Sequence, residues 1–240
     1  MTLVDHLHQV QERIAAACAR AGRDPSQVTL VAVSKTHPFE LILEAVAAGL
    51  QHFGENRVEE AAVKIPQVLS QTDKALRWHM IGHIQSRKAR LIPPLFDVVH
   101  SVDDYKLAGK LSATAVEENK VLDVLLQVNV SGEESKSGFN AVNWQGSTEV
   151  REQLWREVQQ VLTLPNLKVR GLMTMAPIVE DMEQTRPVFA SLAALRAELS
   201  TSLKIVLPDL SMGMTDDFPV AIEEGATLIR VGRAIFGERL

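Results

Sequence analysis

The sequence predicts a single (β/α)8 barrel, an α/β fold in which eight parallel strands alternate with helices. Eight short apolar segments alternate with stretches of helical periodicity, and no linker or break in composition interrupts them. The length of 240 residues is close to the roughly 250 residues typical of such barrels. An open dinucleotide-binding sheet is disfavoured because no Gly-x-Gly-x-x-Gly follows a strand. We therefore expect one domain spanning residues 1–240.

The N-terminal part predicts an extra helix ahead of the first strand. Residues 3–21 place apolar side chains at helical spacing, and Gly22 follows at a position that favours a helix end. Residues 28–33 are almost wholly apolar and rich in valine, as in a strand buried on both faces. Pro38 then suits the first turn of a helix that Gly49 ends.

The remaining elements follow the same alternation. A polar loop with three glycines is expected at 131–146 and is long enough to be a functional segment. Further strands are predicted at 51–54, 78–82, 97–101, 121–130, 168–174, 209–212 and 227–231, and further helices from 58, around 85–88, at 103–118, 148–162, 180–200 and 218–224, and from 234.

Composition excludes several classes of protein. The chain is 46% hydrophobic and 23% charged, and its net charge of −5 argues against binding to nucleic acid or anionic membranes. The single Cys18 permits no intrachain disulfide, and its helical spacing predicts a core position. The N-terminus lacks the pattern of a signal peptide, and no apolar run is long enough to span a membrane. We expect a soluble, cytoplasmic protein.

Lys35 ends the first strand, and ligands bind at the carboxyl edge of the sheet in α/β folds. This stretch alone allows two interpretations. Lys35 is either a solvated lysine at a strand end or an amine in an apolar mouth whose pKa is lowered for Schiff-base chemistry.

Two stretches near the C-terminus form either a phosphate-binding site or ordinary turns, because glycines at strand ends are common turn residues. They end strands seven and eight, whose loops often hold phosphate in (β/α)8 enzymes. Ser211 offers a hydroxyl, Gly213 and Gly232 let the backbone approach an anion, and the N–H groups near Arg233 can point at phosphate oxygens. Asp216 and Asp217, expected in the first turn of the next helix, would repel phosphate.

Other chemistries have weaker support. His79 and His83 straddle a strand end and Gly82, so they do not share a helical face as metalloprotease ligands do, and no metal site is expected. His79 is either a satisfied pocket residue or a ring that lines a ligand. No Gly-x-Ser-x-Gly elbow is present, and Glu55 lacks an obvious second carboxylate for barrel hydrolase chemistry.

Seven motifs occur in order along the chain: Val-Ser-Lys-Thr at 33–36, Phe-Gly-Glu-Asn at 53–56, Trp-His-Met-Ile-Gly-His-Ile-Gln at 78–85, Ser-Lys-Ser-Gly at 135–138, Arg-Gly-Leu-Met at 170–173, Ser-Met-Gly-Met-Thr-Asp-Asp at 211–217 and Ile-Arg-Val-Gly-Arg-Ala-Ile-Phe-Gly at 229–237. Together they resemble the pyridoxal phosphate homeostasis protein family. The resemblance runs from about residue 10 to the end. It implies the barrel fold of the alanine racemase N-terminal domain, which is fold type III of pyridoxal phosphate proteins.

The resemblance implies pyridoxal 5′-phosphate (PLP) as cofactor and assigns a role to each matching residue. Lys35 matches the lysine that forms the internal aldimine, and Arg230 matches the arginine that faces the pyridine nitrogen. The other matches form the phosphate cradle (Ser211, Gly232 and Arg233), line the cofactor (Asn56 and His79) or shape the adjacent loop (Met212 and Gly213). Many members have a small hydroxyl residue where this chain has Arg233, whose side chain could pair with phosphate or turn to solvent.

The resemblance leaves two functions to compare. A guanidinium cannot accept a proton, so Arg230 would weaken the pyridine ring as an electron sink. A racemase of this fold takes its second acid–base group, a tyrosine, from a further domain, whereas this chain's only tyrosine is Tyr105. We therefore expect a PLP carrier that buffers PLP or delivers it to apo-enzymes, with a PLP-dependent amino-acid racemase as the alternative. A monomer is expected, and a barrel that merely binds a phosphorylated metabolite would leave Lys35 unexplained.

Overall fold

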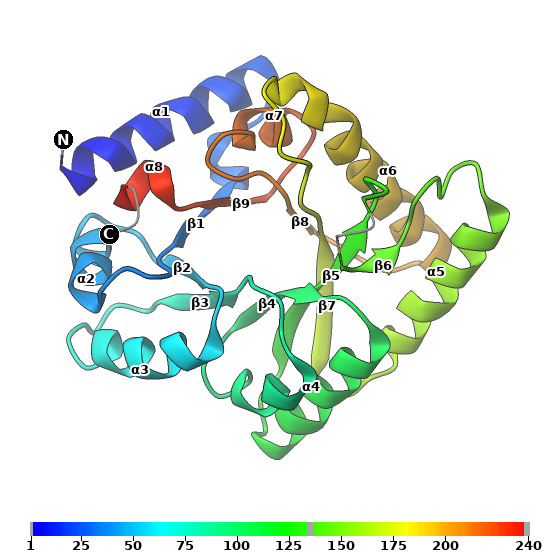
Figure 1. The fold of residues 1–240 in the computed structure, drawn as a ribbon, viewed down its shortest axis with the longest axis horizontal. Helices are drawn as coiled ribbons and strands as arrows, with labels where there is room; N and C mark the ends of the chain where they lie inside the picture. The colour runs from blue at the N-terminus through cyan, green and yellow to red at the C-terminus, as the bar shows by residue number, and fades with distance from the viewer. Residues whose placement is uncertain (1, 134–136, 238–240) are drawn as a thin grey trace.

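The computed structural model describes residues 2–133 and 137–237, and its strands form one parallel sheet that closes into a barrel. Eight strands make the wall in the order β4-β3-β2-β1-β9-β8-β7-β5, and pairing of β4 with β5 closes it (Figure 1). The strands are β1 (Thr29–Val33), β2 (His52–Glu55), β3 (Arg77–Met80), β4 (Val98–Val102), β5 (Leu122–Asn129), β7 (Leu167–Met173), β8 (Asp209–Ser211) and β9 (Leu228–Val231). The predicted (β/α)8 barrel is confirmed.

Helices surround the barrel in the ring seen in Figure 1. They are α1 (Leu3–Arg20), α2 (Phe39–Ala47), α3 (Val58–Leu69), α4 (Tyr105–Glu117), α5 (Thr148–Leu162), α6 (Arg186–Leu203), α7 (Phe218–Glu223) and α8 (Arg233–Phe236), with 3-10 segments η1 (Pro25–Gln27), η2 (Ser86–Leu91) and η3 (Met182–Thr185). None of the helices in the described ranges is both long and apolar enough to cross a lipid bilayer.

The extra N-terminal helix α1 lies beside α7 and α8 (Figure 1) and packs against both. It begins with a capping box, in which the Asp5 backbone N–H donates to the Thr2 hydroxyl and the Thr2 N–H donates to the Asp5 carboxylate. The last helix, α8, is only four residues long. Helix α1 therefore covers the seam between β9 and β1 that a full eighth helix would otherwise cover.

The core has two layers because side chains alternate across each strand. The outer layer lies between strands and helices and includes Cys18, which is fully buried as expected. The inner layer fills the barrel with Val31, Val98, Leu125, Met173 and Leu228. The barrel is thus a packed core, and its carboxyl end is left to carry a site.

Three elements differ from the sequence-based expectation. The segment around 85–88 is the 3-10 helix η2, and the helix expected over 180–200 begins only at Arg186. Pro187 explains this start, because proline is accommodated in a first helical turn but not in a helix interior. A short strand, β6 (Phe139–Asn140), pairs with β5 inside the predicted loop. Residues 135 and 136 of the Ser-Lys-Ser-Gly motif lie outside the described residues.

Candidate functional site

The predicted site residues gather at the carboxyl edge of the barrel because all the strands run parallel. Lys35 is half-buried two residues beyond β1, and Asn56 directly follows β2. Ser211 ends β8 and Arg230 lies within β9. At Gly232 an added Cβ would lie 3.3 Å from the backbone oxygen of Val33, so the ends of β9 and β1 are in close contact.

A buried cluster of polar side chains holds the turn that carries Lys35. The Lys64 Nζ on α3 donates to the Ser34 backbone oxygen at 3.0 Å and forms ion pairs with Glu55 at 3.0 Å and Glu60 at 2.7 Å. The Ser34 hydroxyl also donates to Glu55 at 2.8 Å, and the Thr36 N–H donates to Glu60 at 2.6 Å. Residues on both sides of Lys35 are therefore fixed.

The turn requires a strained backbone at Thr36 and a buried carboxylate at Glu55, which has a structural role. Thr36 has a φ of +66°, a left-handed conformation that a β-branched residue rarely adopts. Burial raises the pKa of Glu55 against the opposing effect of the Lys64 charge, and Oε2 of Glu55 has no hydrogen-bond partner among the described residues. Glu55 points to Lys64 and Ser34, so it supports the turn instead of acting as a hydrolase carboxylate.

Arg230 is a buried cation held by neutral oxygens. Its guanidinium donates to the Ser211 hydroxyl at 2.5 Å and to the Thr174 backbone oxygen at 3.0 Å. Burial lowers the Arg230 pKa to about 10, partly offset by the charge of Asp217. No carboxylate of the described chain forms an ion pair with Arg230. Its positive charge is therefore left to interact with an electron-rich group at the barrel mouth.

Three histidines form a row of contacts that leads from Ser211 into the barrel interior. Sequence reasoning identified only His79 as a site residue. Nδ1 of His100 lies 2.7 Å from the Ser211 hydroxyl, Nε2 of His100 lies 2.8 Å from Nδ1 of His79, and Nε2 of His79 lies 3.0 Å from Nδ1 of His52. The signal for His52 and His100 was present. Each occupies an inward-facing position of a strand, where an apolar residue is expected.

Asp216 and Asp217, in the loop after β8, do not lie in the first turn of a helix as expected. Helix α7 begins at Phe218, so both residues precede it. Asp217 is buried and accepts a hydrogen bond from the Met214 N–H at 2.6 Å, while Asp216 forms an exposed ion pair with Arg233 at 2.7 Å. The Arg233 side chain is thus turned to the rim, and the repulsion expected from Asp216 is neutralised.

The backbone beside Arg230 follows a sharp turn at Gly213. This residue has a φ of +92°, and an added Cβ would lie 2.7 Å from the Cβ of Ala221. The Gly213 backbone oxygen accepts a hydrogen bond from the Arg230 N–H at 3.0 Å. Met212 is buried in the outer core layer, so its backbone reaches the mouth and its side chain does not.

Asn56 lines a hollow of about 310 Å³ together with Arg57, His83 and Lys88. Its Oδ1 is buried without a hydrogen-bond partner among the described residues, so it can accept a hydrogen bond from a ligand. His83 is exposed and contacts Asp103 at 3.1 Å, away from His79. No metal-binding group of three or more His, Cys, Asp or Glu occurs in residues 2–133 and 137–237.

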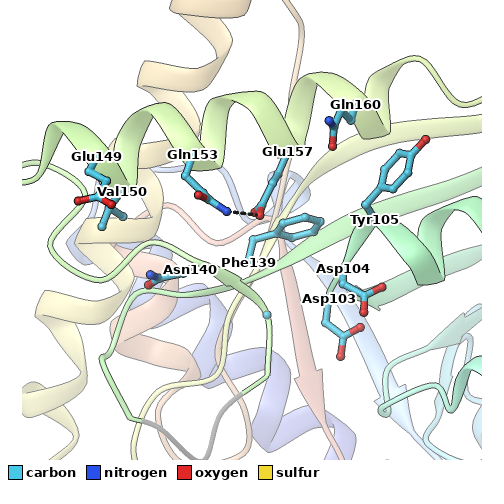
Figure 2. Close-up of a pocket in the computed structure, with 11 residues that line it drawn as sticks. Asp103, Asp104, Tyr105, Phe139, Asn140, Glu149, Val150, Gln153, Glu157 and Gln160 are labelled. Atoms are coloured by element: carbon cyan, nitrogen blue, oxygen red, sulfur yellow. Dashed lines mark hydrogen bonds between the residues drawn. The ribbon is translucent and has the colours of Figure 1, made fainter.

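A second hollow, of about 460 Å³, lies between α5, β6 and the start of α4 (Figure 2). Tyr105 and Phe139 line it, and Gln153 donates to Glu157 on its α5 side at 2.9 Å. Burial raises the pKa of Asp103 on its opposite side. None of the predicted cofactor residues lines this hollow, which places the only tyrosine of the chain elsewhere than the Arg230 region.

The chain is similar to known proteins along its whole length. A family described as alanine racemase, N-terminal domain, matches residues 6–240. The chain is similar to proteins named pyridoxal phosphate homeostasis protein: 43% identical to that of Aquifex aeolicus over 239 residues (100% of this chain, 99% of the relative) and 45% identical to that of Pseudomonas aeruginosa over 238 residues (99% and 96%).

Solved structures share the fold. PipY of Synechococcus elongatus PCC7942, solved with PLP bound, is 39% identical with a TM-score of 0.78, covering 95% of this chain and 100% of PipY. An alanine racemase of Clostridium difficile 630, 12% identical with a TM-score of 0.71, shares the fold alone, over 98% of this chain and 57% of the racemase.

Proposed function

We infer a function from the premise that the chain belongs to the pyridoxal phosphate homeostasis protein family. The protein binds PLP and acts in PLP homeostasis, as a carrier that buffers or delivers the cofactor. A single observation carries the assignment. Lys35, in the turn that Lys64 holds through Ser34, lies at the same barrel edge as the buried Arg230. The hydrogen-bond partners of Arg230 are neutral oxygens. When bound, PLP supplies an aldehyde that reacts with primary amines.

The residues present fit this group. Lys35 is the covalent attachment point, and Arg230 donates to the pyridine nitrogen, for which it has a charge without a carboxylate partner in the described structure. The Ser211 hydroxyl and the backbone N–H groups at Gly232 and Arg233 hold the phosphate. Gly232 suits this role because its backbone lies against Val33 with little room for a side chain.

The remaining residues shape the site. Asn56 offers its unsatisfied Oδ1 to the ligand, while Met212 and Gly213 form the turn that supports Arg230. His79 has both ring nitrogens in contact with other histidines, so it acts on the ligand through His100 and Ser211. The Arg233 side chain stays on Asp216, and its backbone serves the cradle.

The racemase alternative is less well supported. A two-base racemase needs an acid–base group on each face of the bound substrate. Tyr105, the one tyrosine of the chain, begins α4 and lines the second hollow. Arg230 as a donor would also keep the pyridine nitrogen unprotonated and weaken carbanion stabilisation. We therefore propose that the protein has no racemase activity.

An absorbance spectrum tests the cofactor assignment. The purified protein with PLP should show a band at about 420 nm, as expected for a covalent lysine adduct. Borohydride should trap PLP on the peptide that contains Lys35. Lys35→Ala should lose both signals, whereas Lys106→Ala, at an exposed position on α4, should keep them. A protein that, after incubation with PLP and removal of the free cofactor, shows neither this band nor a borohydride-trapped adduct would overturn the proposal.

We further propose that residues 1–240 act as one domain and as a monomer in the cytoplasm, with apo-enzymes that require PLP as transient partners and no role in nucleic-acid or membrane binding. Light scattering after size exclusion measures the mass against the 26.5 kDa of the chain. Delivery requires that an apo-enzyme regain activity from the loaded protein faster than PLP dissociates into solution.

A further inference from the structure

A continuous chain of hydrogen-bonding side chains crosses the barrel interior. It starts at His52 on β2, passes through His79 on β3 and His100 on β4, and ends at Ser211 on β8 and Arg230 on β9. Four successive contacts of 3.0, 2.8, 2.7 and 2.5 Å join the ring nitrogens, the hydroxyl and the guanidinium. We call His52, His79 and His100 the histidine relay.

The relay is electrically neutral. Burial lowers the pKa of His79 to about 3 and that of His100 well below its ordinary value, and burial also lowers the pKa of the half-buried His52. Positive charges at both ends of the relay also lower the pKa values of its rings. Arg77, paired with Asp123, lies near His52, and Arg230 lies near His100. The negative charge of Asp97 near His52 opposes this lowering only in part.

A neutral imidazole has one nitrogen that donates and one that accepts. Because each link joins one nitrogen to the next ring, the relay has only two fully hydrogen-bonded orders. In the first, Ser211 donates to Nδ1 of His100, His100 and His79 each donate through Nε2 to the next ring, and His52 accepts through Nδ1. In the second, each ring donates through Nδ1 towards Ser211, and His100 donates to the hydroxyl oxygen.

The two orders give Ser211 opposite capacities. Arg230 can only donate, so the Ser211 oxygen accepts its hydrogen bond in both cases. In the first order the single hydroxyl hydrogen is used on His100. In the second order that hydrogen is available for an acceptor at the barrel mouth, and a phosphate oxygen is such an acceptor.

We propose that the histidine relay consists of positioning residues that aim the Ser211 hydroxyl at the phosphate, and that a bound phosphate selects the order in which all three rings donate through Nδ1. This inference rests on the proposed PLP function of the same site. It assigns to His52, at the far end of the barrel interior, an influence on ligand affinity that needs no contact with the ligand.

Nitrogen-15 NMR of the imidazoles tests the proposal on the unmodified protein, because the two nitrogens of each ring report which one carries hydrogen. With PLP bound, His52, His79 and His100 should all carry hydrogen on Nδ1. His83, exposed and outside the relay, serves as the reference. If PLP binds while His79 or His100 carries hydrogen on Nε2, the relay proposal is wrong and the cofactor assignment stands.

Two variants of His52, the relay residue farthest from Ser211, test whether this residue controls the direction of the hydrogen bonds. His52→Asn can either donate to or accept from His79, so it permits both orders and should bind PLP more tightly than His52→Asp does. His52→Asp can only accept as a carboxylate, so it should move the hydrogen of His79 and His100 to Nε2. The loss of one hydrogen bond to the phosphate then weakens PLP binding about tenfold.

The outcomes separate the two proposals. Equal affinities for the Asn and Asp variants, or unchanged ring tautomers in His52→Asp, would overturn the relay. A wild-type protein that forms no borohydride-trapped adduct would overturn the PLP assignment, and the relay proposal with it. Thermal unfolding of both variants establishes that they are folded, and the wild-type NMR measurement depends on neither.

Discussion

Two lysines near the same turn show how surroundings decide what a residue does. The Lys64 ammonium has three donors, and three oxygens take them up, from Ser34, Glu55 and Glu60. Such a saturated ammonium is a structural group. Lys35, half-buried two residues beyond β1, is the lysine that we propose binds the ligand. In that proposal the site depends on a second lysine, which holds the turn of the first in position.

The buried histidines predict a specific pH dependence of stability. The folded-state pKa of His79 is about 3, below its unfolded value of 6.5. The unfolded chain therefore binds more protons between these values. The stabilisation is complete above pH 6.5 and is lost as the pH falls towards 3. Between pH 7 and 5, His79 should remove about 2 kcal/mol of unfolding free energy.

Urea unfolding of wild type and His79→Phe at both pH values measures this effect. The stability advantage of wild type should shrink by about 2 kcal/mol on acidification. Val98→Ala, a cavity variant at a buried neighbour of His79 on β4, should instead have a cost that is constant with pH. Burial raises the pKa of Glu55 and gives the opposite dependence, but this contribution is common to all three proteins. A constant advantage over His79→Phe would contradict the prediction.

At the scale of elements, the cluster that joins α3 to the ends of β1 and β2 is predicted to be costly to break. Lys64→Met leaves the Glu55 carboxylate buried with the Ser34 hydroxyl as its remaining partner. Removing one partner of a buried pair typically costs about 3–5 kcal/mol. The raised pKa of Glu55 lets it take up a proton, so we expect the lower end, measured by urea unfolding.

The double variant Glu55→Gln/Lys64→Met serves as the control, because it removes the unpaired charge as well. It should be more stable than Lys64→Met alone, with a coupling energy well above the scatter of independent sites, about 0.5 kcal/mol. Additive costs would show that Lys64 and Glu55 do not stabilise each other, and that the Lys35 turn is held by other contacts.

The elements were largely predictable from sequence and the contacts between them were not. Apolar runs gave the eight barrel strands to within a few residues, since a buried strand needs such a run. The two-residue strand β6 has too little pattern to detect. The relay was missed because His52, His79 and His100 meet only through the pairing of β2, β3 and β4.

At the scale of the whole molecule, the first and last strands of the barrel, β1 and β9, pair side by side at one seam. β1 pairs with β9 over four residue pairs, and α1 packs on α7 and α8 outside that seam. Arg20 and Arg186 form ion pairs with Glu223 across α1, α6 and α7. Partly exposed pairs of this kind contribute little, about 0–1 kcal/mol each. The buried apolar face of α1 therefore contributes more to holding this helix on the seam than these ion pairs do.

The packing of α1 on this seam predicts that Cys18 reacts with thiol reagents only when the whole barrel unfolds. Cys18 is fully buried on α1, and burial raises its pKa, which further slows reaction. Leu7→Ala, at a 2% exposed position on the same face, should lower stability by about 3 kcal/mol and speed native-state labelling roughly a hundredfold. Leu69→Ala, at a half-exposed position on α3, should change neither. The free energy of exposing Cys18 should equal the urea unfolding free energy in each protein. Labelling faster than that value permits would mean that α1 detaches by itself and that the eight strands stay closed without it.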